Sequence, residues 1–287
     1  MTKPISPLRQ RMLDDMTFRN MSPNTQKIYS YAVANFSAFH GRSPDKLGVE
    51  DVRAYRLHLI GRGLKATSIN PIIGALRFFY GTTLGRKEMI EEMPFARKAD
   101  TLPAVLSQEQ VVRLLQAEPN LKMRTAFTTI YAAGLRVSEV VALTARDIDS
   151  ARMVIRIQQA KGRKDRYVML SKQLLAILRV YWKHTRPPHW LFPGPDSSKA
   201  VTTRSLQRSF RWAADAAGLD NSVTVHTLRH SFATHLLEQG VDIRVIQDLL
   251  GHRQITSTTR YARVALNIIG KIQSPLELLN LGASPPA

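Results

Sequence analysis

The chain has 287 residues, enough for one large or two ordinary domains with a substantial core. Hydrophobic residues make up 44% of it, which is typical of globular proteins and excludes a disordered or fibrous chain. Lysine and arginine number 41 against 22 acidic residues, a net charge of +19. An excess of that size favours a polyanionic partner.

Cysteine is absent, which excludes disulfides and thiolate metal sites and fits a reducing compartment. No run reaches the roughly 18 apolar residues of a membrane-spanning helix. The N-terminal segment MTKPISPLRQRMLDD lacks the apolar core of a secretion signal. A purely solubilising charge and an anionic membrane surface are the weaker alternatives. We therefore expect a cytoplasmic protein that binds nucleic acid.

The first hundred residues predict a small, basic, all-helical domain. Residues 1–20 show no clear pattern, and Ser22-Pro23 then combines an N-cap with proline at the first helical position. Apolar residues recur at helical spacing in four segments, the last of them weaker: from Pro23 up to Gly41, from Val49 to Leu59, from Ile69 to Tyr80 with Gly81 at its end, and around Arg86 to Met93. Basic side chains lie along these segments: Lys27, Arg53, Arg56, Arg62, Lys65 and Arg77.

A polar, basic segment with Pro103, FARKADTLPAV, interrupts the helical pattern and is the best candidate for a linker. We place a helical domain at residues 1–98, the linker at 99–104 and a second domain at 105–287.

The second domain is predicted to be mixed, with helices on both sides of a β-hairpin. Ser107 and Gln110 form a capping box, and Gly134 is placed to end a helix over residues 123–133. Two short β-rich segments, MVIRIQQ and RYVMLS, are joined by the polar residues 160–165 and predict the hairpin. Further helices are expected from the apolar pattern at 174–181 and 206–217.

Residues 224–261 predict two amphipathic helices and the start of a third, and they carry His226, Arg229, His252 and Tyr261. This set suits attack on a phosphodiester by a protein nucleophile. Such a reaction needs an attacking oxygen, cations on the non-bridging oxygens, a base and an acid for the leaving oxygen. Arginine is the best phosphate ligand because its planar fork donates two hydrogen bonds and stays charged.

Taken singly, none of these residues is good evidence for a catalytic role. A histidine or tyrosine on a helix is more often a packed or surface residue than a catalytic one. Arg136 could form a surface ion pair with Glu139, and Lys161 could be any solvated lysine or phosphate anchor.

The order of the motifs along the chain is more informative about function than any single motif. AAGLRVSEVVALT comes first, followed by AKGRKDRYVML, HTLRHSFATHLL, LLGH and TSTTRY. This series, over roughly residues 105–262, resembles the tyrosine recombinase (phage integrase) family, and within it the two-domain Xer and transposon-integrase type. The resemblance implies a mainly α protein, with an N-terminal helical (SAM-like) core-binding domain and a C-terminal mixed α catalytic domain that contains a small β-hairpin or sheet.

The resemblance also implies six catalytic residues: Arg136, Lys161, His226, Arg229, His252 and Tyr261. It makes the two arginines the ligands of the scissile phosphate. It makes the lysine the acid that protonates the departing 5′-oxygen.

The resemblance also assigns roles to the remaining three residues. His226 is implied to be the acid/base partner of the tyrosine, and His252 to hydrogen-bond the phosphate. Tyr261 is implied to be the nucleophile that becomes a 3′-phosphotyrosine.

By the same resemblance, the partner is double-stranded DNA with specific recombination sites. Strands are exchanged through a Holliday junction by a tetramer on two sites, without metal or nucleotide cofactor. The free protein is expected to be a monomer or weak oligomer in the bacterial cytoplasm, associated with the nucleoid when bound. The family commonly donates a C-terminal helix to a neighbouring subunit, and residues 262–287 with their prolines match that poorly.

Two alternatives stay open at this point. One is a non-catalytic DNA-binding protein on the same scaffold, and the other is a type IB topoisomerase. The DNA target, the direction of recombination, the mobile element served and the need for a second recombinase are not indicated by the sequence.

Overall fold

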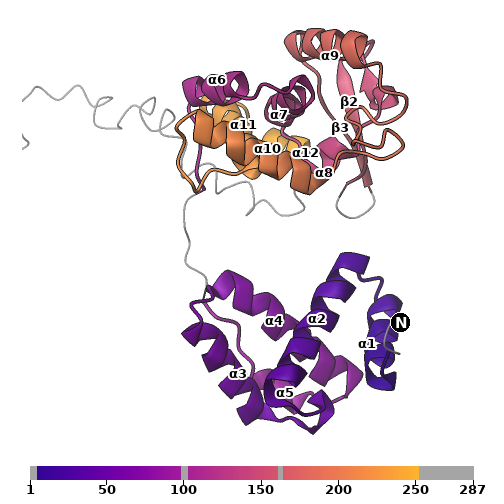
Figure 1. Cartoon of the computed structure of the whole chain (residues 1–287), viewed down its shortest axis with the longest axis vertical. Helices are drawn as coiled ribbons and strands as arrows, with labels where there is room; N and C mark the ends of the chain where they lie inside the picture. Colours follow the sequence, from indigo (N-terminus) through magenta and orange to yellow (C-terminus); the bar gives the residue numbers. More distant parts are fainter. Residues whose placement is uncertain (1–4, 98–102, 161–163, 252–287) are drawn as a thin grey trace, which may run out of the picture. The chain divides into compact units, whose positions relative to one another are not determined.

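The computed structural model describes residues 5–97, 103–160 and 164–251, and the chain divides into two compact units, Met1–Asp100 and Thr101–Ala287 (Figure 1). Both units are mainly helical, and the second also contains a small sheet. The expected fold class is confirmed. In the described part of the chain, no helix is both long and apolar enough to cross a membrane.

The first unit is a bundle of short helices around aromatic side chains. Its elements are α1 (Pro7–Phe18), α2 (Pro23–His40), η1 (Pro44–Lys46), α3 (Val49–Gly61), α4 (Ala66–Phe78), η2 (Phe79–Thr83) and α5 (Glu88–Glu91). The Ser22 hydroxyl accepts a hydrogen bond from the amide of Thr25 and so begins α2 as predicted. Phe36 and Leu76 are fully buried where α2 packs on α4, and Tyr80 donates to the carbonyl of Pro44 at 2.7 Å.

Three features of the first unit differ from the predictions. Helix α1 lies in the segment for which the sequence showed no clear pattern. It buries only two methionines, and two apolar positions are too few to make a helical period visible in the sequence. Gly81 does not end the third helix, since a π-helical turn continues to Thr83. A Cβ at Gly81 would lie 2.1 Å from Cδ1 of Ile90, so a larger residue there would require the Ile90 side chain to move. Ile28, Tyr31 and Phe39 have the spacing of a buried face but are exposed.

In its described residues, the second unit places eight helical segments around a hairpin. Its elements are α6 (Gln108–Ala117), α7 (Leu121–Ala133), α8 (Val137–Val141), η3 (Ala145–Asp147), β1 (Ile148–Asp149), β2 (Val154–Ala160), β3 (Lys164–Met169), α9 (Lys172–Thr185), α10 (Thr203–Ala216), α11 (Val225–Glu238) and α12 (Ile243–Leu250). Ser107 and Gln110 form the predicted capping box, and Gly134 ends α7 with a positive φ of 63°.

The predicted hairpin is confirmed as strands β2 and β3, which pair antiparallel with Val154 opposite Met169. The two-residue strand β1 pairs with β2 and gives the sheet order β1-β2-β3. Along β3 and the residue that follows it, the side chains alternate: Val168 and Leu170 are buried, whereas Tyr167 and Met169 are exposed. Arg166 belongs to the inward set by the same alternation.

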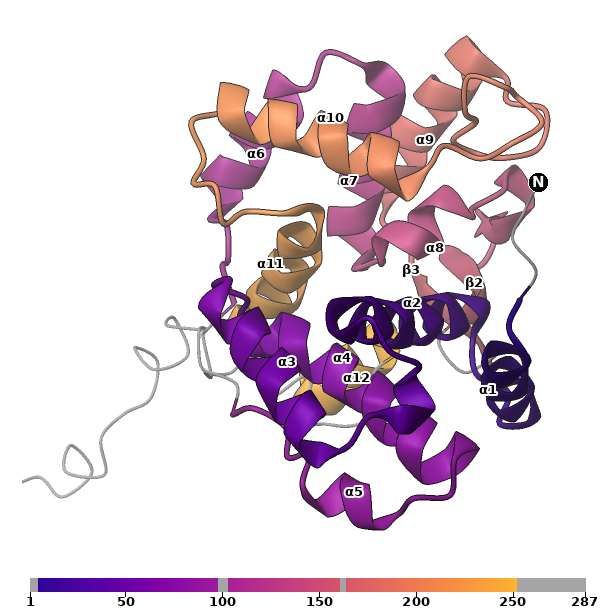
Figure 2. The same cartoon turned by 60° about the horizontal axis from the view of Figure 1, so that its bottom comes forward.

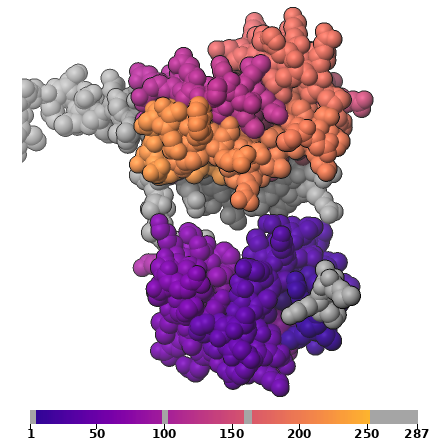
Figure 3. Space-filling model, in the orientation of Figure 1, coloured from indigo at the N-terminus to yellow at the C-terminus, as the bar shows by residue number. Residues whose placement is uncertain are grey.

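Helix α7 is the central element of the second unit. It packs against α6, α8, α9, α10 and α11, and Phe127 and Ile130 on it are fully buried (Figure 2). The magenta atoms of the α6–α7 segment and the orange atoms of the α10–α11 segment adjoin closely (Figure 3). Helix α11 is buried on most of its surface instead of being amphipathic, because α7, α10 and α12 all contact it.

Candidate active site

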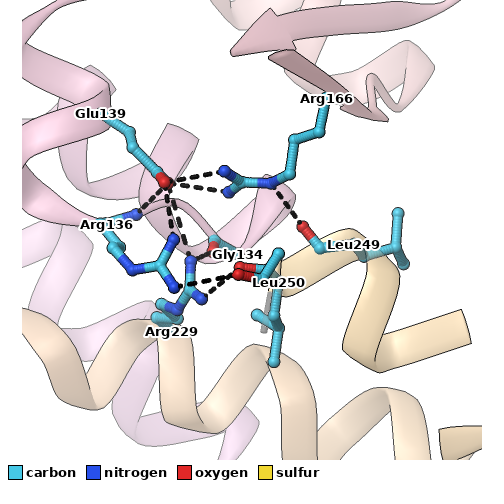
Figure 4. A network of polar contacts seen from close by, with 8 residues as sticks. Gly134, Arg136, Glu139, Arg166, Arg229, Leu249 and Leu250 are labelled. Carbon is cyan, nitrogen blue, oxygen red and sulfur yellow. Dashed lines mark hydrogen bonds and ion pairs between the residues drawn. The ribbon is translucent and has the colours of Figure 1, made fainter. Parts of the chain in front are cut away.

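The polar centre of the second unit is a buried carboxylate, Glu139, contacted by three arginines (Figure 4). Arg166 donates from Nη1 to Oε1 and from Nη2 to Oε2, both at 2.8 Å. Arg136 donates from Nη1 to Oε1 and from its backbone amide to Oε2, also at 2.8 Å. Nη1 of Arg229 lies 3.7 Å from Oε2. We call these four residues the Glu139 cluster.

Local structure explains how the cluster forms. Arg136 is the N-cap of α8 and Glu139 is its third residue, so a capping box turns the carboxylate back onto the arginine. Gly134 ends α7 two residues earlier, and its carbonyl accepts from Nη1 of Arg229 at 2.7 Å. A Cβ on Gly134 would lie 2.5 Å from the ring of Phe232, so only glycine fits there.

The C-terminal end of α12 closes the cluster. Three successive carbonyls each accept from a different arginine: Leu249 from Nε of Arg166 at 3.1 Å, Leu250 from Nη2 of Arg229 at 2.6 Å, and Gly251 from Nη2 of Arg136 at 3.4 Å. The last carbonyls of a helix have no intrahelical partner and carry partial negative charge, so guanidinium groups are suitable caps.

The pKa of Glu139 is held far below its ordinary value. Burial alone would raise this pKa, but the hydrogen bonds and charge of Arg166, together with those of Arg136, lower it to about 2. The side chain of Glu139 is only 7% exposed, so solvent screens these contacts little. Glu139 is therefore ionised throughout the physiological pH range.

Replacing Glu139 with glutamine is expected to lower the free energy of unfolding at pH 7 by about 3 kcal/mol, because it leaves buried guanidinium groups uncompensated. The depressed pKa gives the sign of the pH dependence. The stabilisation is complete above pH 4.5 and is lost as the pH falls towards 2, so wild type and variant should converge there. Denaturant titrations across this range measure the difference.

The control for this variant is Asp165→Asn, which removes the exposed ion pair of Asp165 with Arg156 on the hairpin. We expect it to change the free energy of unfolding by no more than about 1 kcal/mol. An equal effect of both substitutions would contradict the role given to the buried carboxylate.

His226 is the second residue of α11 and lies one helical turn before Arg229. Its side chain reaches the surface, yet the pKa of His226 is lowered from 6.5 by burial, and then by the positive charges of Arg229 and Arg136. The ring is therefore neutral at pH 7 and can accept a proton.

We expect the imidazole of His226 to titrate below pH 6.5, and to titrate at higher pH in an Arg136→Ala variant, which lacks one of the charges that lower its pKa. A titration followed by NMR of the ring protons measures both values. A midpoint above 6.5 in the wild type would contradict the lowered pKa of His226, and equal midpoints in wild type and variant would show that Arg136 does not act on this ring.

Of the six residues predicted from the sequence, Arg136 and Arg229 come together on Glu139, with His226 within reach of their charges. Lys161, His252 and Tyr261 lie outside the described residues. The ion pair of Arg136 with Glu139, considered above as a possible surface contact, is instead largely shielded, with the side chains 23% and 7% exposed. Among the described residues, no three histidine, aspartate or glutamate side chains are grouped as ligands for a metal ion.

Comparison with known proteins identifies the chain. The profile described as phage integrase family matches residues 104–267, more than half of the chain, and the profile described as phage integrase, N-terminal SAM-like domain, matches residues 8–89. The chain belongs to the phage integrase family. The resemblance drawn from its motifs is thereby confirmed.

Relatives in this family align with nearly the whole chain. A protein of Sinorhizobium fredii named "Putative integrase/recombinase y4qK" is 47% identical over 284 residues, covering 98% of this chain and 92% of its own. The tyrosine recombinase XerA of Thermococcus kodakarensis is 33% identical over 263 residues, covering 90% and 91%. The solved Tn1549 transposon integrase in complex with transposon right end DNA shares the fold, with a TM-score of 0.70, 20% identity and coverage of 92% and 99%. This phage integrase family member is accordingly a tyrosine-type DNA recombinase, and a non-catalytic role is not favoured.

Arg166 is a residue of the Glu139 cluster in this integrase-family chain that the motifs did not single out. The signal was nevertheless present in the sequence. Arg166, Val168 and Leu170 alternate along one strand, and an arginine among inward-facing apolar residues is rarely buried without a carboxylate partner.

Proposed function

We propose that the protein cleaves and rejoins DNA at specific sites through a 3′-phosphotyrosine at Tyr261, and exchanges strands through a Holliday junction. The observation that carries the proposal is the pairing of Arg136 and Arg229 on one buried carboxylate beside a neutral His226. Two guanidinium groups fixed in this way can bind the non-bridging oxygens of a phosphodiester.

The arginines of the Glu139 cluster supply the electrostatic part of the mechanism. Three guanidinium groups face one carboxylate, which leaves the cluster with two net positive charges. The phosphorane formed on attack carries one more negative charge than the ground state. Donors that are already oriented stabilise this added charge without a reorganisation cost.

We assign the remaining roles as the resemblance to the family implies them. Tyr261 loses its proton to His226 and attacks the phosphorus, while Lys161 protonates the departing 5′-oxygen and His252 hydrogen-bonds the phosphate. The phosphodiester energy stays in the protein linkage. A free 5′-hydroxyl can therefore reverse the step on the partner strand, and neither nucleotide nor metal is needed.

We further assign residues 1–98 to core binding, 99–104 to the linker and 105–287 to catalysis, acting together on double-stranded DNA. The net charge of +19 supports a DNA partner, and so does the fold shared with an integrase solved with transposon right end DNA. A tetramer on two sites would act in the cytoplasm, on the nucleoid. A second recombinase could replace two of its protomers.

The test is a suicide DNA substrate that carries the recombination site and a nick beside the cleaved bond, so that the leaving fragment diffuses away. We expect a protein–DNA complex that survives denaturant, with the nucleotide linked to the peptide containing Tyr261 and a yield unchanged by chelator. Binding without covalent linkage would indicate an accessory DNA-binding protein. Relaxation of plasmids without a site would indicate a topoisomerase.

A further inference from the structure

Arg166 uses its whole guanidinium group within the Glu139 cluster. Nη1 and Nη2 bind both oxygens of Glu139, and Nε binds the carbonyl of Leu249. The side chain is 11% exposed and also packs along Gly251, where a Cβ would lie 3.0 Å from its Cδ. Arg166 therefore joins strand β3, helix α8 and the end of helix α12.

The hydrogen bonds of Glu139 show what Arg166 contributes. A carboxylate offers about four acceptor positions. Arg136 fills two of them and Arg166 fills two, while Arg229 stays at the longer distance of 3.7 Å. Without Arg166, the freed acceptors would draw Arg229, now 3.7 Å away, onto Glu139 and shift its guanidinium group. Arg229 is one of the two arginines proposed to bind the phosphate.

The end of α12 is held by the same arrangement. Arg166 binds the first of its three capped carbonyls, and Arg229 and Arg136 bind the next two. His252 directly follows Gly251 in the sequence. The contact with Leu249 therefore fixes the helix end against both phosphate-binding arginines.

We propose that Arg166 is a positioning residue of the recombination reaction: it saturates Glu139 and anchors the end of α12, so that Arg136 and Arg229 stay directed at the scissile phosphate. This inference rests on the proposed function. It adds that docking of α12 is a condition for cleavage, and that the hydrogen bonds of Glu139 decide how much of each arginine is available to DNA.

The experiment measures single-turnover cleavage of the suicide substrate with enzyme in excess, and separates the rate constant from the reacting fraction. For Arg166→Met we expect a rate constant roughly 10- to 100-fold lower, because displacing a catalytic group by about 1 Å costs that much. Binding to the uncleaved site should be unchanged. Arg166→Lys, which keeps the charge without the fork, should be intermediate and also tests the idea if the methionine variant does not fold.

The matched control is Arg156→Met, which removes an arginine of the same hairpin that pairs with Asp165 at 2.8 Å but is 49% exposed. Its rate constant should equal that of the wild type. If Arg166→Met lowers only the reacting fraction, Arg166 is merely structural and the proposal is overturned. An unchanged rate constant in both Arg166 variants overturns it too.

Two further measurements show through which group the loss of Arg166 lowers the cleavage rate constant. A double variant with Glu139→Gln should lose less than the product of the two single losses, since Arg166 acts through Glu139; multiplicative losses would contradict this. A substrate with a bridging 5′-sulfur, whose leaving group needs no proton, should not restore the rate of Arg166→Met. Restoration would mean that Arg166 acts through protonation of the leaving group by Lys161 instead.

If the wild type forms no covalent complex, the proposed function itself fails.

Discussion

Tyr261→Phe is expected to eliminate the covalent protein–DNA complex while leaving affinity for the site unchanged. In the proposed mechanism, the substitution removes the oxygen that attacks phosphorus and keeps the aromatic ring of the side chain. Because cleavage and rejoining share this nucleophile, recombination of a two-site plasmid should also disappear. Denaturing gels of the suicide-substrate reaction and a gel-shift titration measure the two properties separately.

Tyr167→Phe is the matched control, since Tyr167 lies on β3 in the same unit and is 57% exposed. It should form the covalent complex at the wild-type rate. A wild-type yield from Tyr261→Phe would mean that another side chain is the nucleophile, and the assignment would have to be abandoned.

Arg229→Ala is expected to lower the cleavage rate constant by roughly 10²–10³-fold, equivalent to about 3–4 kcal/mol of lost transition-state stabilisation. It removes a guanidinium group that is 5% exposed and donates to the carbonyls of Gly134 and Leu250. The variant should also unfold more easily, because those carbonyls lose a buried partner. Single-turnover cleavage and denaturant titration distinguish the two losses.

Arg124→Ala is the control for this loss. Arg124 likewise donates to backbone carbonyls, those of Glu118 and Pro119, at 2.9 and 3.4 Å, but it is outside the Glu139 cluster. We expect its cleavage rate constant to match the wild type. Cleavage by Arg229→Ala within a few-fold of the wild type would exclude Arg229 as a phosphate ligand.

Much of the fold was predictable because it depends on interactions between residues close in the sequence. Ser107, Gly134 and the alternation along the hairpin act within a few residues, so their effects can be read from neighbouring positions in the sequence. Helix α1 and the π-helical turn after Phe78 were missed, since both pack against residues outside their own segments. Gly81 lies beside Ile90, and the methionines of α1 enter the core of the first unit.

The site was predictable in its residue types but not in its connections. The spacing of His226 and Arg229 placed them one helical turn apart, and the structure agrees. That Glu139 is buried, and that Arg166 shares it, depends on the side chain of Arg166 on strand β3 reaching helix α8, which no local pattern specifies. The roles of Lys161, His252 and Tyr261 stay predictions.

The contacts that close the Glu139 cluster join segments far apart in the chain. Arg229 reaches Gly134 across 95 residues, Arg136 reaches Gly251 across 115, and Arg166 reaches Leu249 across 83. Loop closures of this length are slow and are completed only when the intervening elements have packed. A newly synthesised or partly folded chain therefore contains the individual arginines but no assembled centre. The Glu139 cluster, and with it the proposed phosphate site, therefore exists only once the tertiary structure of the second unit is complete.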